Sequence, residues 1–534
     1  MKNLLLLGDE AIAQAALDAG MSGMYAYPGT PSTEIMEYIQ SSKTAIGRNV
    51  HREWSANEKT AMEAALGMSY CGKRAMVAMK HVGLNVAADP FINSAMTGVN
   101  GGLIVVSADD PSMHSSQNEQ DSRFYGKFAN IPCFEPSSQQ EAYEMIFDAF
   151  ELSEKYRLPV LFRITTRLAH SRASVSLKDP VPEKTLTLPA DPVQFVLLPA
   201  IARKKYKYLL DAYEKLRYEN RLGKYNIFKD GSKREMGIIA CGIAYNYLME
   251  NIGDSADMFP VLKISGYPFP KDIIKDITGR CESVLVLEEG APVVEESLRG
   301  ILDETIKIYG RMDGTVPRDG ELNPAIVARS LGMETSYGND VPSLVRNRPP
   351  SFCKGCGHSD MFNALIEALK SYESGSVFSD IGCYTLGALP PYSSINSCVD
   401  MGASVTMAIG AADAGLFPSV CVIGDSTFTH SGMTGLLDAV VKGSSVTIII
   451  SDNSTTGMTG GQESHATGRL VQICKGLGVD EEHIRTITPL RKNHEENVSI
   501  MRKEFEFRGV SVVIAARECI QTATKRKRSE ASTR

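Results

Sequence analysis

The run "FCKGCGH" at residues 352–358 brings together side chains that can bind metals. Cys353 and Cys356 are separated by two residues, and His358 follows two positions later. This spacing suits a zinc site completed by thiolates and a histidine, and it also suits part of an iron–sulfur cluster. It is equally compatible with small side chains that pack for structural reasons. The spacing alone leaves these three alternatives open.

A second set of polar residues follows two apolar runs. Gly424, Asp425 and Ser426 come directly after "SVCVI", and Asp452 and Asn453 come one residue after "SVTIII". The 28 residues from Asp425 to Asn453 suffice for a helical crossover, which would place both polar ends at one edge of a parallel sheet. Carboxylate and amide oxygens suit Mg²⁺, and glycine lets a diphosphate approach the backbone. The sequence therefore predicts a diphosphate–magnesium site.

The elements that must position these groups follow from apolar runs that alternate with helical patterns, as is typical of parallel α/β sheets. The predicted boundaries are 1–182 and 346–520 for two α/β domains, 234–345 for a third, 183–233 for a helical linker and 521–534 for a basic, solvated tail. The apolar run from Asn3 to Leu7 predicts a buried first strand.

Length and composition restrict the class of protein. The chain has 534 residues, of which 43% are hydrophobic and 22% charged, as in multidomain globular proteins. A net charge of -7 provides no field that would attract nucleic acid, and no stretch approaches the ~18 uninterrupted apolar residues of a membrane helix. We therefore expect a cytoplasmic protein that binds neither nucleic acid nor membranes, and whose 11 cysteines are thiols or metal ligands.

The segments "GDSTF", "DN" and "GMTGGQ" resemble the diphosphate motif of thiamine diphosphate enzymes, in the form found in the 2-oxoacid:ferredoxin oxidoreductases. The resemblance implies a pyrimidine-binding domain at 1–182, a diphosphate-binding domain at 346–520 and, between them, a domain like the C-terminal domain of transketolases. It implies thiamine diphosphate and Mg²⁺ as cofactors. The implied Mg²⁺ ligands are the side chains of Asp425 and Asn453 and the backbone carbonyl of Thr455. The residues implied to bind the diphosphate are Gly424, Ser426, Gly457, Met458 and Thr459.

Further segments of the first domain resemble the same family. "NEKTAMEAALGMSYCG" resembles the motif whose carboxylate contacts the aminopyrimidine ring, which implies Glu58, with Glu63 as the fallback. "YPGTPSTE" resembles the loop whose threonine contacts the 2-oxoacid, which implies Thr30. "MKHVGLNVAADP" and "SADDPSMHSSQNEQDSRFYG" are most similar to the large (alpha) subunits of indolepyruvate ferredoxin oxidoreductases. They make three residues candidate neighbours of the substrate: His81, His114 and Arg123.

In this family four cysteines hold a [4Fe-4S] cluster, and the corresponding residues here are Cys353, Cys356, Cys383 and Cys519. The remaining cysteines show no pairing pattern and are predicted to pack in the core: Cys71, Cys133, Cys241, Cys281, Cys398, Cys421 and Cys474. Such large subunits normally continue into a ferredoxin-like domain with two C-x2-C-x2-C-x3-C-P runs, which this sequence lacks. We therefore expect electrons to leave from the proximal cluster directly or through another cluster-bearing subunit, unless the reaction is not oxidative.

The resemblance implies a subunit for amino-acid catabolism that oxidatively decarboxylates aryl 2-oxoacids, such as indolepyruvate or phenylpyruvate, to acyl-CoA with ferredoxin as electron acceptor. It also implies coenzyme A as co-substrate, a separate small (beta) subunit and a dimer of heterodimers. One alternative is a non-oxidative, thiamine diphosphate-dependent decarboxylase or carboligase, which would not need the four cysteines. The other is a binding or scaffold subunit without turnover.

Overall fold

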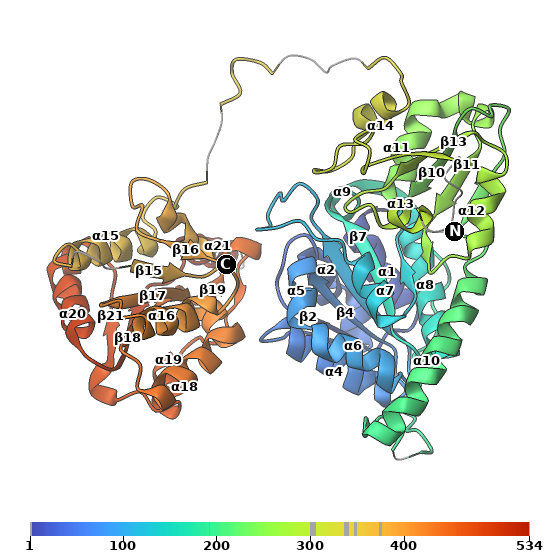
Figure 1. The fold of residues 1–534 in the computed structure, drawn as a ribbon. Helices are drawn as coiled ribbons and strands as arrows, with labels where there is room; N and C mark the ends of the chain where they lie inside the picture. The colour runs from blue at the N-terminus through green and yellow to red at the C-terminus, as the bar shows by residue number, and fades with distance from the viewer. Residues whose placement is uncertain are drawn as a thin grey trace. The chain divides into compact units, whose positions relative to one another are not determined.

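The computed structural model describes residues 3–191, 193–299, 306–335, 341–346, 350–372 and 376–532. The chain forms two compact units, Met1–Asp340 and Val341–Arg534. Two large sheets belong to the first unit and one to the second (Figure 1). Within these ranges no helix combines the length and the apolar character needed to cross a bilayer.

The first sheet has seven strands in the order β12-β6-β7-β5-β4-β2-β3, and all pair in parallel except β12 with β6. They are β2 (Gly23–Ala26), β3 (His51–Trp54), β4 (Ala75–Lys80), β5 (Leu103–Asp109), β6 (Cys133–Phe134), β7 (Val160–Thr165) and β12 (Gly266–Tyr267). One face packs against α1 (Gly8–Asp18), α2 (Thr33–Ser41) and α8 (Gln139–Tyr156), and the other against α4 (Glu58–Tyr70), α6 (Ala88–Thr97) and α10 (Pro199–Glu219). The strands are apolar throughout because helices bury both faces. Further short helices are α3 (Lys43–Gly47), α5 (His81–Val86), α7 (Arg123–Ala129) and α9 (Thr166–His170).

Two segments of the first unit differ from the expectation. The run from Asn3 to Leu7 forms β1 (Asn3–Leu7), but it pairs antiparallel with β8 (Arg172–Ser176) outside the main sheet, and Leu5 is 66% exposed. The prediction of a buried strand is wrong, because an apolar run of this length does not distinguish a core strand from a peripheral ribbon. In the segment expected as a linker, α10 packs Leu209, Ala212 and Leu216 into the core of the first sheet.

The second sheet has five strands in the order β14-β13-β10-β11-β9, and only β9 is antiparallel. They are β9 (Ile227–Lys229), β10 (Gly237–Cys241), β11 (Val261–Ile264), β13 (Ser283–Leu287) and β14 (Lys307–Tyr309). α11 (Ile243–Ile252) and α14 (Pro324–Ser330) join the core of the first sheet, whereas α12 (Lys271–Thr278) and α13 (Val293–Leu298) cover the other face. The first unit is therefore held together by a hydrophobic core that extends over both sheets.

The third sheet lies in the second unit and has six parallel strands in the order β16-β15-β17-β18-β22-β21. They are β15 (Ser376–Ser379), β16 (Ser397–Cys398), β17 (Ser419–Gly424), β18 (Val446–Asp452), β21 (Ile484–Ile487) and β22 (Val510–Ala516). One face packs against α16 (Ala403–Asp413), α18 (Met433–Lys442) and α19 (Leu470–Gly476), and the other against α15 (Gly357–Leu369) and α20 (His494–Glu506). The tail that we expected to be solvated is exposed over most of residues 521–528, and it forms the helix α21 (Ile520–Ser532), in keeping with its content of good helix formers.

Candidate functional site

Two neighbouring strands of the third sheet end at Gly424, directly before Asp425, and at Asp452. Gly424 pairs with Ser451 in parallel register, so the loops that follow start at the same edge of the sheet. Asp425 is 2% exposed, and its Oδ2 has no hydrogen-bond partner among the described residues. Burial, aided by the charge of Asp452 and opposed by a hydrogen bond from Ser464, raises the pKa of Asp425 to about 7. A buried oxygen without a partner is costly, and a divalent cation would satisfy it.

The loop after β18 is tied to the loop after β17. The side-chain oxygen of Asn453 accepts the backbone N–H of Thr455 at 3.1 Å. The hydroxyl of Thr456 donates to the hydroxyl oxygen of Ser426 at 3.1 Å. The two glycine-containing loops predicted to bind the diphosphate are thus in direct contact.

Gly457, Met458 and Thr459 form one turn of 3-10 helix at the end of this loop. Met458 is 59% exposed, and the hydroxyl of Thr459 donates to Oε1 of Gln462 at 2.6 Å. A Cβ atom at Gly457 would lie 3.3 Å from Sγ of Cys383. The predicted diphosphate loop is therefore a neighbour of the predicted cluster cysteines.

The four cysteines singled out above line one pocket of the second unit: Cys353, Cys356, Cys383 and Cys519. The same pocket is lined by Asp452, Asn453 and Gly457 from the diphosphate loop and by His358. Burial raises the pKa of Cys383 to about 11, and the charges of the other three thiols add to the shift. Holding four thiolates together in this setting requires a cationic group among them.

The positions of Cys353, Cys356 and His358 do not favour the zinc site considered above. Four sulfur ligands at about 2.3 Å from one Zn²⁺ ion lie only about 3.8 Å apart. Within the described ranges, Cys353, Cys356 and His358 do not bring three ligand atoms within 4.8 Å of one another. Burial lowers the pKa of His358 to about 4, and its Nδ1 lies 3.2 Å from Sγ of Cys356. A cluster places different demands on its ligands, because each of the four thiolates binds its own iron.

In the first unit, Glu58 is the first residue of α4 and is 6% exposed. The side chain of Asn57 caps this helix. Glu58 packs against α5, because a Cβ atom at Gly83 would lie 2.6 Å from its Oε1. Glu63 lies on the outer side of the same helix, where it is half exposed and forms an ion pair with Lys59. The surroundings therefore favour Glu58 over the fallback Glu63.

Thr30 follows β2 and belongs to a chain of contacts that includes a lysine missed by the sequence analysis. The hydroxyl of Ser115 donates to the carbonyl of Thr30 at 3.3 Å. The ammonium group of Lys80 donates to the carbonyl and the hydroxyl of Ser115, at 2.9 Å and 3.2 Å. Burial lowers the pKa of Lys80 to about 8, opposed by the charge of Asp110. The available signal was its position at the end of the apolar strand "AMVAMK", where parallel sheets place their ligands.

The two candidate histidines have different surroundings. His81 is 1% exposed and its Nε2 lies 3.2 Å from the carbonyl oxygen of Asn118, so Nε2 is the donor of this hydrogen bond. Its Nδ1 is buried with no hydrogen-bond partner among the described residues. His114 is exposed and its Nε2 lies 2.9 Å from a carboxylate oxygen of Glu321. His81 therefore has a buried nitrogen available for a ligand, whereas His114 is engaged at the surface.

Arg123 lies in a closed ion network rather than in an open site. Its side chain is 1% exposed and donates to Asp121 at 2.9 Å, to Glu288 at 3.0 Å and to the carbonyl of Ala291 at 2.9 Å. It also donates to the hydroxyl of Tyr267, so that every guanidinium nitrogen has a partner. We therefore assign Arg123 to the structure and not to substrate contact. In sequence alone, an arginine that balances buried acids cannot be distinguished from one that binds a substrate.

Comparison with known proteins identifies both thiamine domains. Residues 14–200 match the thiamine diphosphate-binding domain of pyruvate flavodoxin/ferredoxin oxidoreductases, and residues 380–506 match the C-terminal TPP-binding domain of thiamine pyrophosphate enzymes. The fold is similar to that of a 2-oxoglutarate:ferredoxin oxidoreductase from Magnetococcus marinus (TM-score 0.50, 16% identity, 62% of this chain and 65% of that chain covered). The matched domains, together with the relatives described next, define a thiamine diphosphate-dependent enzyme of the 2-oxoacid:ferredoxin oxidoreductase class.

Three archaeal relatives match over nearly the whole chain, and each is an indolepyruvate oxidoreductase subunit IorA. The Archaeoglobus fulgidus protein is 39% identical, with 99% of this chain and 88% of the relative covered. The Pyrococcus abyssi protein is 38% identical (97% and 86% covered), and the Methanothermobacter thermautotrophicus protein is 37% identical (97% and 87% covered). The chain belongs to the family of the indolepyruvate oxidoreductase IorA subunits, which confirms the resemblance found in its motifs.

Proposed function

We propose that this large subunit, together with a separate small subunit, oxidatively decarboxylates aryl 2-oxoacids such as indolepyruvate to acyl-CoA and passes the electrons to ferredoxin. The relatives named above support the aryl substrate. The solved relative, which has 2-oxoglutarate, coenzyme A and succinyl-CoA bound, supports an acyl-CoA product. The observation that carries the proposal is the single pocket lined by the four cysteines and by residues of the diphosphate loop.

In the second unit, the two strand ends would hold the charged part of the cofactor. Asp425, Asn453 and the carbonyl of Thr455 would bind Mg²⁺, and the orphaned Oδ2 of Asp425 supports this assignment. The glycine-containing loops, Gly424 to Ser426 and Gly457 to Thr459, would bind the diphosphate. The cysteines would hold a [4Fe-4S] cluster as an acceptor of single electrons.

In the first unit, buried groups would act on the cofactor ring and on the substrate. Bound thiamine diphosphate supplies the carbon centre that adds to the keto group and stabilises the resulting carbanion. Glu58 would hold a proton at a ring nitrogen of the aminopyrimidine. Lys80 would bind the substrate carboxylate, since two of its donors go to Ser115 and a third makes no hydrogen bond within the described ranges. His81 would offer Nδ1, and Thr30 its hydroxyl, to the same substrate.

Anaerobic purification of the chain with its small subunit tests the proposal. Iron and acid-labile sulfide are measured, and EPR spectra are recorded after addition of indolepyruvate and coenzyme A. We expect about four irons per chain and a reduced-cluster or radical signal that depends on the substrate. An iron-free enzyme that releases an aldehyde from the oxoacid would instead be the non-oxidative decarboxylase. Tight thiamine diphosphate binding without turnover would identify a scaffold subunit.

The pKa of Asp425 predicts how cofactor binding depends on pH. In the absence of a cation this carboxyl has a pKa of about 7, so a proton competes with Mg²⁺ below that pH. The affinity for Mg²⁺ should fall by up to about tenfold per pH unit below pH 7 and level off above about pH 8. Calorimetric titration of Mg²⁺ in the presence of thiamine diphosphate measures the profile. Asp425→Asn should bind Mg²⁺ weakly and without this dependence, and a flat profile in the unmodified protein would contradict the assignment.

Replacing Lys80 with methionine is expected to weaken substrate binding. The loss of one charge-assisted hydrogen bond to a carboxylate corresponds to a rise in KM for indolepyruvate of about 10- to 100-fold, with a smaller change in kcat. Steady-state ferredoxin reduction measures both constants. Lys73→Met is the matched control, because Lys73 is partly exposed and lies 3.7 Å from Glu183. An unchanged KM in the Lys80 variant would remove this lysine from the substrate site.

A further inference from the structure

Asp9 is a fully buried carboxylate for which the proposed reaction has no use. It is 0% exposed, and neither of its oxygens has a hydrogen-bond partner in the part of the chain that the structure describes. Burial, together with the charges of Glu34 and Glu10, raises its pKa well above the ordinary value. Glu10 is already engaged, because its carboxylate accepts the backbone N–H of Leu7 at 2.8 Å. An unpartnered buried carboxyl is costly unless a ligand satisfies it.

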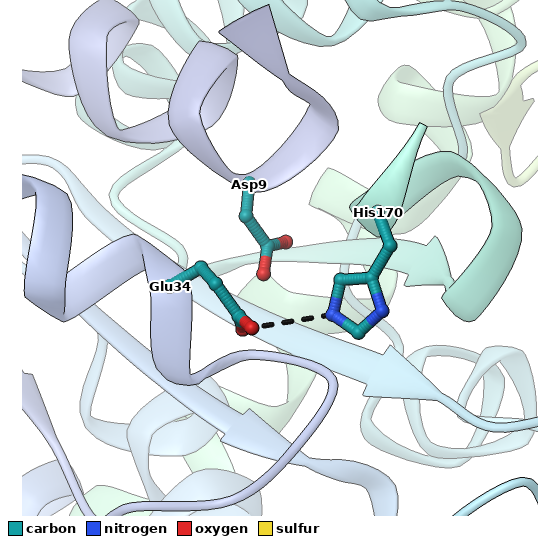
Figure 2. A group of neighbouring side chains, drawn as sticks. All are labelled: Asp9, Glu34 and His170. Atoms are coloured by element: carbon teal, nitrogen blue, oxygen red, sulfur yellow. Dashed lines mark ion pairs between the residues drawn. The ribbon is translucent and has the colours of Figure 1, made fainter. Parts of the chain in front are cut away.

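Two further ligand-type side chains face Asp9 from separate elements (Figure 2). Asp9 lies in the first turn of α1, Glu34 in the first turn of α2, and His170 ends α9. Glu34 and His170 form an ion pair, with 3.6 Å between Oε2 and Nε2. Oε2 of Glu34 is itself buried and has no hydrogen-bond partner among the described residues. One ligand atom from each of the three side chains lies within 4.8 Å of the other two.

We propose that Asp9, Glu34 and His170 bind a divalent transition-metal ion of the Mn²⁺ or Zn²⁺ kind. Two carboxylates neutralise the charge of such an ion, and a neutral imidazole is a preferred ligand of these metals. Ligand atoms about 2.1 Å from a metal lie at most about 4.2 Å apart, so the group needs only a small contraction. Glu34 and His170 can supply it, because their side chains are 34% and 35% exposed. That exposure also gives the ion an entry path to the buried Asp9.

The ion would hold α1, α2 and α9 together beside the candidate substrate loop that contains Thr30. α2 starts three residues after Thr30, and Thr33 at its start accepts the backbone N–H of Gly29 at 3.1 Å. At the other end of α9, the hydroxyl of Thr166 donates to Asp110 at 2.7 Å. Asp110 in turn accepts the backbone N–H of Ser115, the residue that contacts Lys80. The site is therefore a positioning site, and its metal binding does not depend on the proposed reaction.

Manganese binding by the full-length chain tests this proposal. The chain carries Asp425→Asn, so that the Mg²⁺ site proposed in the second unit does not contribute, and it is first treated with chelator under anaerobic conditions. Free Mn²⁺ is followed by EPR during the titration. We expect one Mn²⁺ per chain, competed by Zn²⁺. Asp9→Asn and His170→Ala should each weaken binding by at least about tenfold.

Two controls keep the result interpretable. His494→Ala removes a histidine from the more exposed group Glu367, His494 and Glu495, and it should leave Mn²⁺ binding unchanged. Asp9→Asn replaces an unpartnered buried carboxyl group with an amide of the same shape, so thermal melting should show it to be folded. Mn²⁺ should raise the melting temperature of the parent protein but not of the Asp9 variant. Equal Mn²⁺ binding by the parent, Asp9→Asn and His170→Ala proteins, or no binding by any of them, would overturn the proposal.

Discussion

Replacing Glu58 with glutamine is expected to lower the turnover of indolepyruvate by about 10²- to 10⁴-fold, the usual contribution of a positioned acid–base group. Thiamine diphosphate should still bind, because glutamine keeps the shape that packs against Gly83. It cannot share a proton with the aminopyrimidine ring, however. Ferredoxin reduction and calorimetric cofactor binding, measured on the same preparation, separate the two effects.

Two further variants distinguish proton transfer from a general effect on α4. Glu63→Gln changes a half-exposed acid of the same helix that pairs with Lys59, and its turnover should match that of the unmodified enzyme. Gly83→Ala keeps Glu58 but places a Cβ atom 2.6 Å from its Oε1, which forces the carboxylate to move, so turnover should fall although the acid is present. If Glu58→Gln retained turnover within a few-fold of Glu63→Gln, the pyrimidine contact would have to be assigned to another residue.

Replacing Cys383 with serine is expected to abolish ferredoxin reduction. The cluster would lose one of its four thiolates, and the iron content should drop from about four per chain. Asp425 and the diphosphate loop remain intact, so thiamine diphosphate should still bind. Decarboxylation should then end in release of an aldehyde, because the electrons have no acceptor. Iron analysis, ferredoxin reduction and aldehyde detection, performed on one preparation, measure the three consequences.

Cys398→Ser provides the matched control in the same unit. Cys398 is half buried, its thiol donates to the carbonyl of Asp380 at 3.6 Å, and it is not one of the described residues that line the cysteine pocket. This variant should keep its iron and its ferredoxin reduction. Full oxidoreductase activity in the Cys383 variant would assign the four cysteines to structure and favour the non-oxidative enzyme.

The sheets could be predicted from sequence because parallel strands that are buried on both faces are continuous apolar runs. β17 and β18 are examples, and the helical crossover between them fits the spacing of their polar ends. The position of β1 could not be predicted, since its pairing with β8 depends on a segment more than 160 residues away. The helical structure of the last residues was not predicted either. Helix α21 begins at Ile520, directly after Cys519, which is one of the four pocket cysteines.

The candidate sites differ in how far the sequence predicts them. The spacing of Cys353 and Cys356 left zinc, a cluster and simple packing open, and only the family resemblance brought in Cys383 and Cys519. Lys80 had no motif, because its chemistry arises from burial beside Ser115. Asp9, Glu34 and His170 come from three elements, and no sequence spacing relates them. Sequence reasoning succeeds where ligands follow strands in a known register and fails where tertiary packing creates the site.

The buried ions around Arg123 have a consequence for how the protein unfolds. Arg163 of β7 donates to Asp109 at 2.6 Å and to the carbonyl of Glu289 at 2.9 Å, and Arg123 reaches Glu288. The two arginines thus join the first sheet to the loop that follows β13 of the second. Separating the sheets would leave both guanidinium groups without their partners in an apolar core. Each broken ion pair would cost about 3 to 5 kcal/mol of folding free energy. We therefore expect the second sheet to unfold together with the first and not as an independent module.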